Sequence, residues 1–137
     1  MTTPEELVRL AIEARERSYC PYSQFAVGAA LLCADGRVYQ GCNIENAAFG
    51  PTICAERVAM FKAVYDGQRD FEAIAVAGGR AGEEVTGLFP PCGVCRQVLR
   101  EFCGPDFKLY LAAGGEAYEI RTLGEMLPMS FSNADMK

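Results

Sequence analysis

Three cysteines and one acid have the residue types and spacing of a metal-dependent reaction centre. Glu56 lies two positions after Cys54, and Cys92 and Cys95 form a Cys-x-x-Cys pair directly behind Pro91. Structural zinc takes four protein ligands, whereas catalytic zinc takes three and leaves the fourth position to water. A carboxylate near that position can accept and return a proton. The pattern predicts a catalytic zinc ion held by Cys54, Cys92 and Cys95, with Glu56 as the proton carrier.

Two other interpretations of these cysteines remain open. A structural zinc knuckle would take its fourth ligand from another cysteine of the chain, and Glu56 would then only begin a helix. A redox pair at Cys92 and Cys95 is favoured when the motif directly follows a strand, but this pair follows a glycine-rich loop. Catalytic zinc is the favoured interpretation because it accounts for the ligand count and the acid together.

The composition narrows the class of protein. The chain has 137 residues, 50% of them hydrophobic, and no histidine, which excludes Ser-His-Asp and Cys-His catalysis and any imidazole metal site. Metals held by sulfur are typically zinc. The net charge of −5 opposes attraction to phosphate backbones, so a nucleic-acid partner is not expected. The length predicts a single domain over residues 1–137.

Cysteine usage and hydropathy give an expected location. The seven cysteines are an odd number and the first residues do not resemble a signal peptide, which favours the reducing cytoplasm over a disulfide framework. No apolar run approaches the roughly 20 residues that cross a bilayer, so no membrane association is expected. Four further cysteines are expected to be small buried side chains: Cys20, Cys33, Cys42 and Cys103.

Hydrophobic periodicity predicts the elements that position the candidate site. Thr3 and Pro4 form a helix start, Asp35-Gly36 a hairpin turn, and residues 122–125 a capping box before a brief last helix. Alternation of helices and strands predicts α/β layering on a mixed sheet. The expected helices span 4–17, 54–64 and 92–102, the expected strands span 25–34, 37–43, 71–77, 108–112 and 117–121, and residues 78–90 are expected to be a loop.

The candidate ligands fall at the beginnings of two predicted helices. Unpaired backbone N–H groups and the positive end of the helix dipole stabilise thiolates there. Three thiolates nevertheless make zinc a weaker Lewis acid, so a nearby positive charge is needed. Arg57 is the nearest such charge in the sequence.

Several motifs together resemble one known family. Phe-Ala-Val-Gly-Ala-Ala at 25–30 and Gly-Cys-Asn-Ile-Glu-Asn-Ala-Ala-Phe at 41–49 precede Cys-Ala-Glu-Arg at 54–57, and Pro-Cys-Gly-Val-Cys-Arg-Gln at 91–97 precedes Leu-Pro-Met-Ser-Phe at 127–131. Over nearly its whole length the chain resembles the small homotetrameric, zinc-dependent cytidine deaminases. Cys-x-Glu with Pro-Cys-x-x-Cys is also the signature of zinc deaminases that act on nucleobases.

The resemblance implies a fold, a reaction and an assembly. The implied fold is a three-layer α/β/α arrangement around a mixed five-stranded sheet. The implied reaction is hydrolysis of cytidine and 2′-deoxycytidine to uridine and 2′-deoxyuridine with release of ammonia, as in pyrimidine salvage. The family uses one Zn²⁺ per chain and forms a homotetramer with shared active sites.

The resemblance also assigns roles by position. Glu56 would be the proton shuttle between water, N3 and the leaving amine, and Arg57 would compensate charge at the zinc. Without the resemblance, Asn43 and Glu45 would be interpreted as surface polar residues and Phe25 as a core residue. Phe49 departs from the family, where tyrosine is frequent. The substrate-binding residues by resemblance are Phe25, Asn43, Glu45, Ala55 and Phe131, with Phe131 reaching a neighbouring subunit's site.

Three rival functions remain. A deaminase of another cytosine-bearing molecule, such as a nucleoside antibiotic, would not need the ribose-matching Asn43 and Glu45. A polynucleotide deaminase would need a basic surface for the flipped base, which the acidic balance opposes. A zinc-stabilised binding module would hold four cysteines on the metal and exchange no water.

Overall fold

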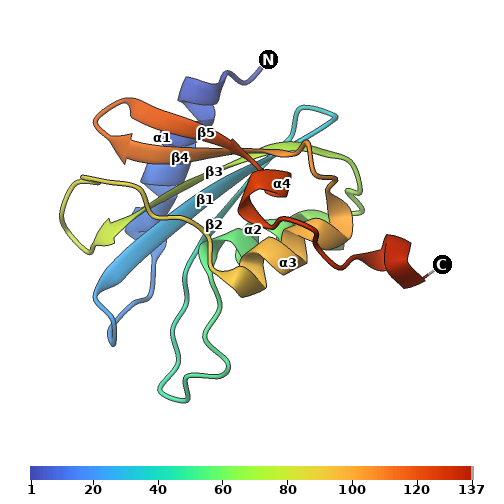
Figure 1. Ribbon diagram of the computed structural model, residues 1–137. Coiled ribbons are helices and arrows are strands. Elements are labelled where there is room, and N and C mark those ends of the chain that lie inside the picture. The colour runs from blue at the N-terminus through green and yellow to red at the C-terminus, as the bar shows by residue number, and fades with distance from the viewer. Residues whose placement is uncertain (137) are drawn as a thin grey trace.

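The computed structural model describes residues 1–136 and confirms a mixed five-stranded sheet (Figure 1). The strand order is β2-β1-β3-β4-β5, with β3 and β4 parallel and the other neighbours antiparallel. The strands are β1 (Phe25–Cys33), β2 (Val38–Cys42), β3 (Phe71–Arg80), β4 (Lys108–Gly114) and β5 (Ala117–Thr122). The helices are α1 (Pro4–Ala14), α2 (Ala55–Tyr65), α3 (Gly93–Phe102) and α4 (Leu123–Met126), with 3-10 turns η1 (Arg15–Arg17) and η2 (Asn133–Met136).

Helices cover both faces of the sheet, which gives the three layers (Figure 1). Side chains of a strand alternate between faces, and β1 divides its apolar residues accordingly. Val27, Ala29 and Leu31 belong to the core beneath α2 and α3, whereas Ala30 and Leu32 belong to the core beneath α1. No helix within residues 1–136 is long and apolar enough to cross a membrane.

The local start and stop signals act as the sequence predicts. Thr3 caps α1 by accepting the Glu6 N–H at 3.1 Å, and Pro4 takes the first helical position. Gly36 adopts a φ of +93° in the β1–β2 turn, a conformation that glycine reaches without steric cost. Thr122 and Glu125 form both hydrogen bonds of the capping box that opens α4.

A close approach at Gly41 brings α2 directly onto the sheet. A Cβ at Gly41 would lie 2.4 Å from the Ala55 carbonyl oxygen and 2.6 Å from the Ala59 nitrogen. Only a residue without a side chain therefore lets the first turn of α2 pack against β2. This contact fixes the height at which Cys54 and Glu56 stand relative to the sheet.

Two sequence expectations are wrong. The loop predicted from residue 78 begins later, because Gly78 and Gly79 pair with Val27 and Ala26 and extend β3 to Arg80; pairing with a central strand overrides the low strand propensity of glycine. Cys33 and Cys103 are buried as predicted, but Cys20 and Cys42 are only half-buried.

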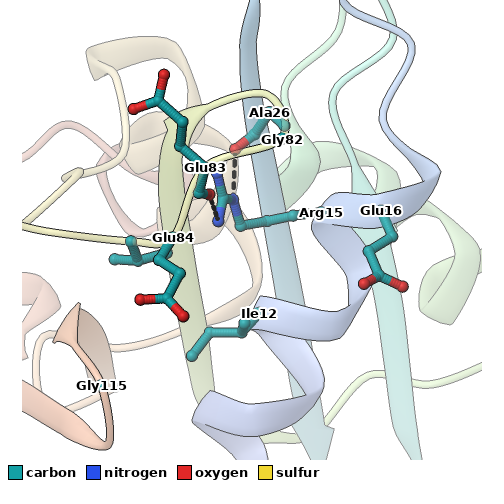
Figure 2. A pocket seen from close by; sticks show the side chains of 9 residues that line it. Ile12, Arg15, Glu16, Ala26, Gly82, Glu83, Glu84 and Gly115 are labelled. Atoms are coloured by element: carbon teal, nitrogen blue, oxygen red, sulfur yellow. Dashed lines mark hydrogen bonds between the residues drawn. The ribbon is translucent and has the colours of Figure 1, made fainter.

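Arg15 ties the end of β3 to β1 from the α1 side (Figure 2). Arg15 is 9% exposed, and its side chain donates from Nε to the Ala26 carbonyl at 2.8 Å, from Nη1 to the Glu83 carbonyl at 3.1 Å and from Nη2 to the Arg80 carbonyl at 3.0 Å. The three backbone carbonyls come from β1, from the end of β3 and from the loop after it. One side chain thus fixes the beginning of the loop that leads to Cys92.

Arg15→Ala is expected to lower the free energy of unfolding by about 3 kcal/mol, because carbonyls in a partly buried region lose a charged donor. Urea denaturation at a fixed protein concentration measures this effect. Arg9→Ala, on the exposed side of the preceding helix α1, is the matched control and should stay within about 0.5 kcal/mol of the parent. Equal losses in the two variants would contradict the role given to Arg15.

Candidate active site

Three cysteine sulfurs that are distant in the sequence lie together. The Sγ atoms of Cys54, Cys92 and Cys95 are all within 4.8 Å of one another, with 3.7 Å between Cys54 and Cys92 and 3.5 Å between Cys92 and Cys95. Tetrahedral zinc with Zn–S bonds of about 2.3 Å separates its sulfurs by about 3.8 Å. The donor set and its spacing therefore fit zinc.

Both helices that carry the sulfurs begin at this point. Cys54 and Cys92 occupy the N-cap positions of α2 and α3, and neither side chain caps its own helix. Their sulfurs are directed to the cluster instead. The unpaired N–H groups and positive dipole ends of two helices consequently face the three sulfurs.

Positive charge and mutual hydrogen bonding favour ionisation of one thiol. The hydrogen bond with Cys95, aided by Arg57, lowers the pKa of Cys54 to about 5. Arg57 Nη2 lies 3.5 Å from the Cys54 sulfur. The hydrogen bond to the Cys54 thiolate, together with burial, raises the pKa of Cys95. Binding of a metal ion would replace the proton of this thiol.

Arg96 directly follows Cys95 in the sequence, but two backbone carbonyls hold its side chain. Its Nε donates to the Pro91 carbonyl at 2.8 Å and its Nη1 to the Met126 carbonyl at 2.6 Å. Arg96 therefore anchors the segment before Cys92, and the charge beside the sulfurs belongs to Arg57.

Glu56 lies next to the sulfurs as a buried acid. Its side chain is 3% exposed, and Oε1 has no hydrogen-bond partner among the described residues. Burial raises the pKa of this carboxyl group to about 7. A carboxyl group with a pKa near neutrality is suited to take up and release protons, and such groups concentrate at active sites.

A cavity of about 330 Å³ opens in front of these groups. Cys54, Glu56 and Cys92 lie at its reactive end, and Asn43, Glu45 and Ser23 supply polar groups elsewhere in the lining. The volume and mixed lining are typical of small-molecule sites. Ala55, assigned to the substrate site, lines the cavity at the first residue of α2. Sequence analysis did not identify the remaining lining residues, which are Ser23, Val27, Thr52, Ile53, Phe89 and Pro90.

The Asn43 side chain is buried and forms hydrogen bonds within the fold. Its side chain is 8% exposed, its Oδ1 accepts from the Val27 N–H and the Ser18 hydroxyl, and its Nδ2 donates to the Phe25 carbonyl at 2.8 Å. One amide N–H remains for a ligand. The interpretation of Asn43 as a surface residue is wrong, because its side chain continues the hydrogen bonding of β1.

Glu45 and Phe25 lie at the mouth of the cavity. Glu45 Oε1 accepts from the backbone N–H groups of Tyr22 and Ser23, and Oε2 accepts from the Ser23 hydroxyl. Phe25 is 37% exposed rather than a core residue, and its ring packs against Phe89 with centroids 6.1 Å apart. An apolar aromatic wall thus faces the polar groups.

Phe131 does not line the cavity of its own chain. It is 61% exposed in the segment after α4, and the Gln97 side chain of α3 holds its carbonyl at 2.9 Å. Arg100 donates to the neighbouring Ser130 hydroxyl at 2.9 Å. The backbone around Phe131 is therefore fixed while its ring projects outward.

Comparison with known proteins identifies the family. The sequence profile described as the zinc-binding region of cytidine and deoxycytidylate deaminases matches residues 1–111. The chain belongs to this deaminase family. It is 51% identical to the cytidine deaminase of Halalkalibacterium halodurans, covering 95% of each chain. It is 48% identical to that of Sporosarcina psychrophila, covering 96% of this chain and 93% of the relative.

A solved relative gives the same result for the fold. The crystal structure of cytidine deaminase from Burkholderia pseudomallei superposes with a TM-score of 0.86 at 44% identity, covering 94% of this chain and 99% of that one. The family's description as zinc-binding agrees with the thiol cluster. Zinc is therefore the cofactor that this deaminase holds.

Cys92→Ala is expected to lose bound zinc, because two thiols cannot replace a three-thiolate site. Metal content per chain after extensive dialysis, measured by inductively coupled plasma mass spectrometry, checks this. Cys20→Ala removes a half-buried thiol outside the cluster and should keep one zinc per chain. Stoichiometric zinc in Cys92→Ala would show that Cys92 is not a ligand.

Proposed function

We propose that this chain hydrolyses cytidine and 2′-deoxycytidine to uridine and 2′-deoxyuridine and releases ammonia in pyrimidine salvage. The observation that carries the proposal is the buried Glu56 carboxyl group, whose Oε1 has no partner among the described residues, beside three clustered thiols in a nucleoside-sized cavity. Membership of the deaminase family supports the same reaction.

In the proposed mechanism the three cysteines hold the metal ion and Glu56 transfers protons. Cys54, Cys92 and Cys95 would hold zinc, which when bound acidifies water and stabilises negative charge on oxygen. Glu56 takes a proton from water and donates it to N3 of the pyrimidine. Once the water oxygen has bonded to C4, Glu56 takes the second proton from that oxygen and passes it to the amine. The C4–N bond then breaks, ammonia leaves, and C4 keeps the oxygen as a carbonyl. Burial of Glu56 supports both roles because its raised pKa allows both proton uptake and proton release near neutral pH.

The polar mouth of the cavity suits a nucleoside rather than a free base. Glu45 retains acceptor capacity for a sugar hydroxyl beside its bonds to Tyr22 and Ser23, and Asn43 retains one donor. The Phe25 ring supplies an apolar face on which a pyrimidine packs. These features favour a ribose-bearing substrate over an unrelated cytosine compound.

The rival binding module needs a fourth ligand. Within residues 1–136, the group of possible metal ligands at this site contains three thiols and no fourth. This count supports an exchangeable fourth position.

All seven cysteines are free thiols, which supports a reducing compartment such as the cytoplasm.

A homotetramer with shared sites is the proposed assembly. Phe61 and Tyr65 of α2 and Ile44 of the preceding segment are exposed around a hydrophobic groove, and grouped exposed apolar residues are typical of subunit interfaces. Phe131 projects away from its own cavity on a backbone held by α3. A neighbouring subunit's cavity would give that ring an apolar environment.

Glu56→Gln is expected to abolish turnover while zinc is retained, since the amide preserves shape but cannot carry protons; the loss should reach about 100-fold or more. Loss of cytidine absorbance and zinc content are measured on the same sample. Glu101→Gln, on the exposed side of α3, should remain active. If Glu56→Gln retained a rate close to the parent, Glu56 would not be the proton shuttle.

Phe131→Ala is expected to raise KM for cytidine while light scattering still shows a tetramer. Met136→Ala, in the same C-terminal segment, is the control and should leave KM unchanged. Co-expression with Glu56→Gln then tests sharing. A hybrid site that combines Glu56 from one chain with Phe131 from its neighbour should recover a low KM. A fully active monomer, or no recovery in hybrids, would contradict the shared site.

A further inference from the structure

Phe89 is a wall of the cavity that the assigned substrate residues do not include. It lies in the segment between β3 and α3, three positions before Cys92, and is half-buried. Its ring faces the cavity and packs against Phe25 at 6.1 Å with an interplanar angle of 45°. The two rings therefore form one continuous aromatic wall close to the reactive end.

Gly78 provides the space in which the Phe89 ring lies. A Cβ at Gly78 would lie 2.4 Å from Cγ, 2.7 Å from Cδ1 and 2.8 Å from Cβ of Phe89. Gly78 is not among the glycines with positive φ, so its backbone conformation would accept a side chain. The requirement for glycine comes from the phenylalanine, and any larger residue would displace the ring.

The sheet register shows where a displaced ring would go. Gly78 pairs directly with Val27, so both positions face the same side of the sheet. The Val27 side chain lines the cavity on that side. If a side chain at position 78 displaced the Phe89 ring, the ring would therefore move into the cavity or lose its packing against Phe25.

Two arginines hold the parts of the chain that carry Phe25 and Phe89. Arg80 lies over the Phe25 ring at 5.2 Å from its centroid, a distance at which a cation attracts an aromatic face. Arg15 holds the Arg80 and Glu83 carbonyls, and Figure 2 shows its bonds to Ala26 and Glu83. The start of the segment that carries Phe89 is thus anchored.

The proposed reaction orients the base relative to this wall. C4 must face the thiol cluster, N1 carries the sugar toward Asn43 and Glu45, and N3 must face Glu56 at the start of α2. N3 and C5 lie on opposite sides of C4 in a pyrimidine ring. C5 therefore points away from Glu56 and α2, and the lining next to the cysteines that α2 does not supply is Phe89, Pro90 and Cys92.

We propose that Phe89 is a specificity-determining residue that closes the cavity against substituents at C5 of the pyrimidine, with Gly78 setting the depth of its ring. The inference rests on the proposed deaminase function. It predicts a site that favours cytidine over nucleosides enlarged at C5, such as 5-methylcytidine.

The test compares kcat/KM for cytidine and 5-methylcytidine. Phe89→Val should raise the ratio of 5-methylcytidine to cytidine efficiency by about tenfold or more, the scale on which a pocket senses one methyl group. Gly78→Ala should lower efficiency on cytidine by about tenfold and lower the ratio further. The double variant Gly78→Ala/Phe89→Val should recover, because the smaller side chain no longer meets the new methyl group.

The control and the opposing outcomes separate the inference from the proposed function. Leu88→Val changes an exposed neighbour that does not line the cavity and should leave the ratio unchanged. If the parent protein deaminates neither nucleoside, the proposed function fails. If it deaminates cytidine but the ratio is unchanged in Phe89→Val, or Gly78→Ala is not rescued in the double variant, the role of Phe89 is wrong.

Discussion

The site depends on two helix N-termini meeting at one point. α2 and α3 begin 38 residues apart in the sequence, at Ala55 and Gly93, yet their capping cysteines bring sulfurs to within 3.7 Å. Clustered thiolates repel one another, so the arrangement is stable only with compensating charge. Two helix dipoles and Arg57 supply part of it, and a bound cation supplies the rest. Metal binding and local folding are consequently linked at this point.

The same geometry explains how Cys54 and Glu56 act on one cavity. In a regular helix, two positions along the chain correspond to a rotation of roughly 200° around the helix axis, so the two side chains point to nearly opposite sides. Cys54 has extended backbone angles as the N-cap of α2, so its sulfur does not follow the helical rotation. The contact of α2 with Gly41 then holds both groups at the edge of the sheet. The Cys54 thiol and the Glu56 carboxyl group therefore line the same cavity, because Cys54 lies just before the first residue of α2.

Polar residues at the mouth of the cavity serve the fold, and in the proposed function they also bind the ligand. Asn43 joins Ser18, Phe25 and Val27, so it completes β1 before it contacts any substrate. Glu45 holds the turn at Tyr22 and Ser23 in the same way. Such preorganisation fixes the remaining donor and acceptor sites without further entropy loss on binding. Substitutions at these two positions are therefore expected to disturb the cavity wall as well as the proposed ligand contacts.

The sequence by itself determined the metal chemistry, the helix starts and the α/β layering, because these depend on residue type and short spacing. Capping residues and hydrophobic period act locally, so Thr3, Gly36 and the capping box at Thr122 behave as predicted. Only the tertiary structure decided that β3 continues through Gly78, that Asn43 is buried and that Phe89 lines the cavity. Each of these features depends on a partner from a distant segment, and periodicity along one chain carries no information about such partners. Gly78 shows the reason most directly, since its significance comes from the ring of Phe89 and not from its own backbone.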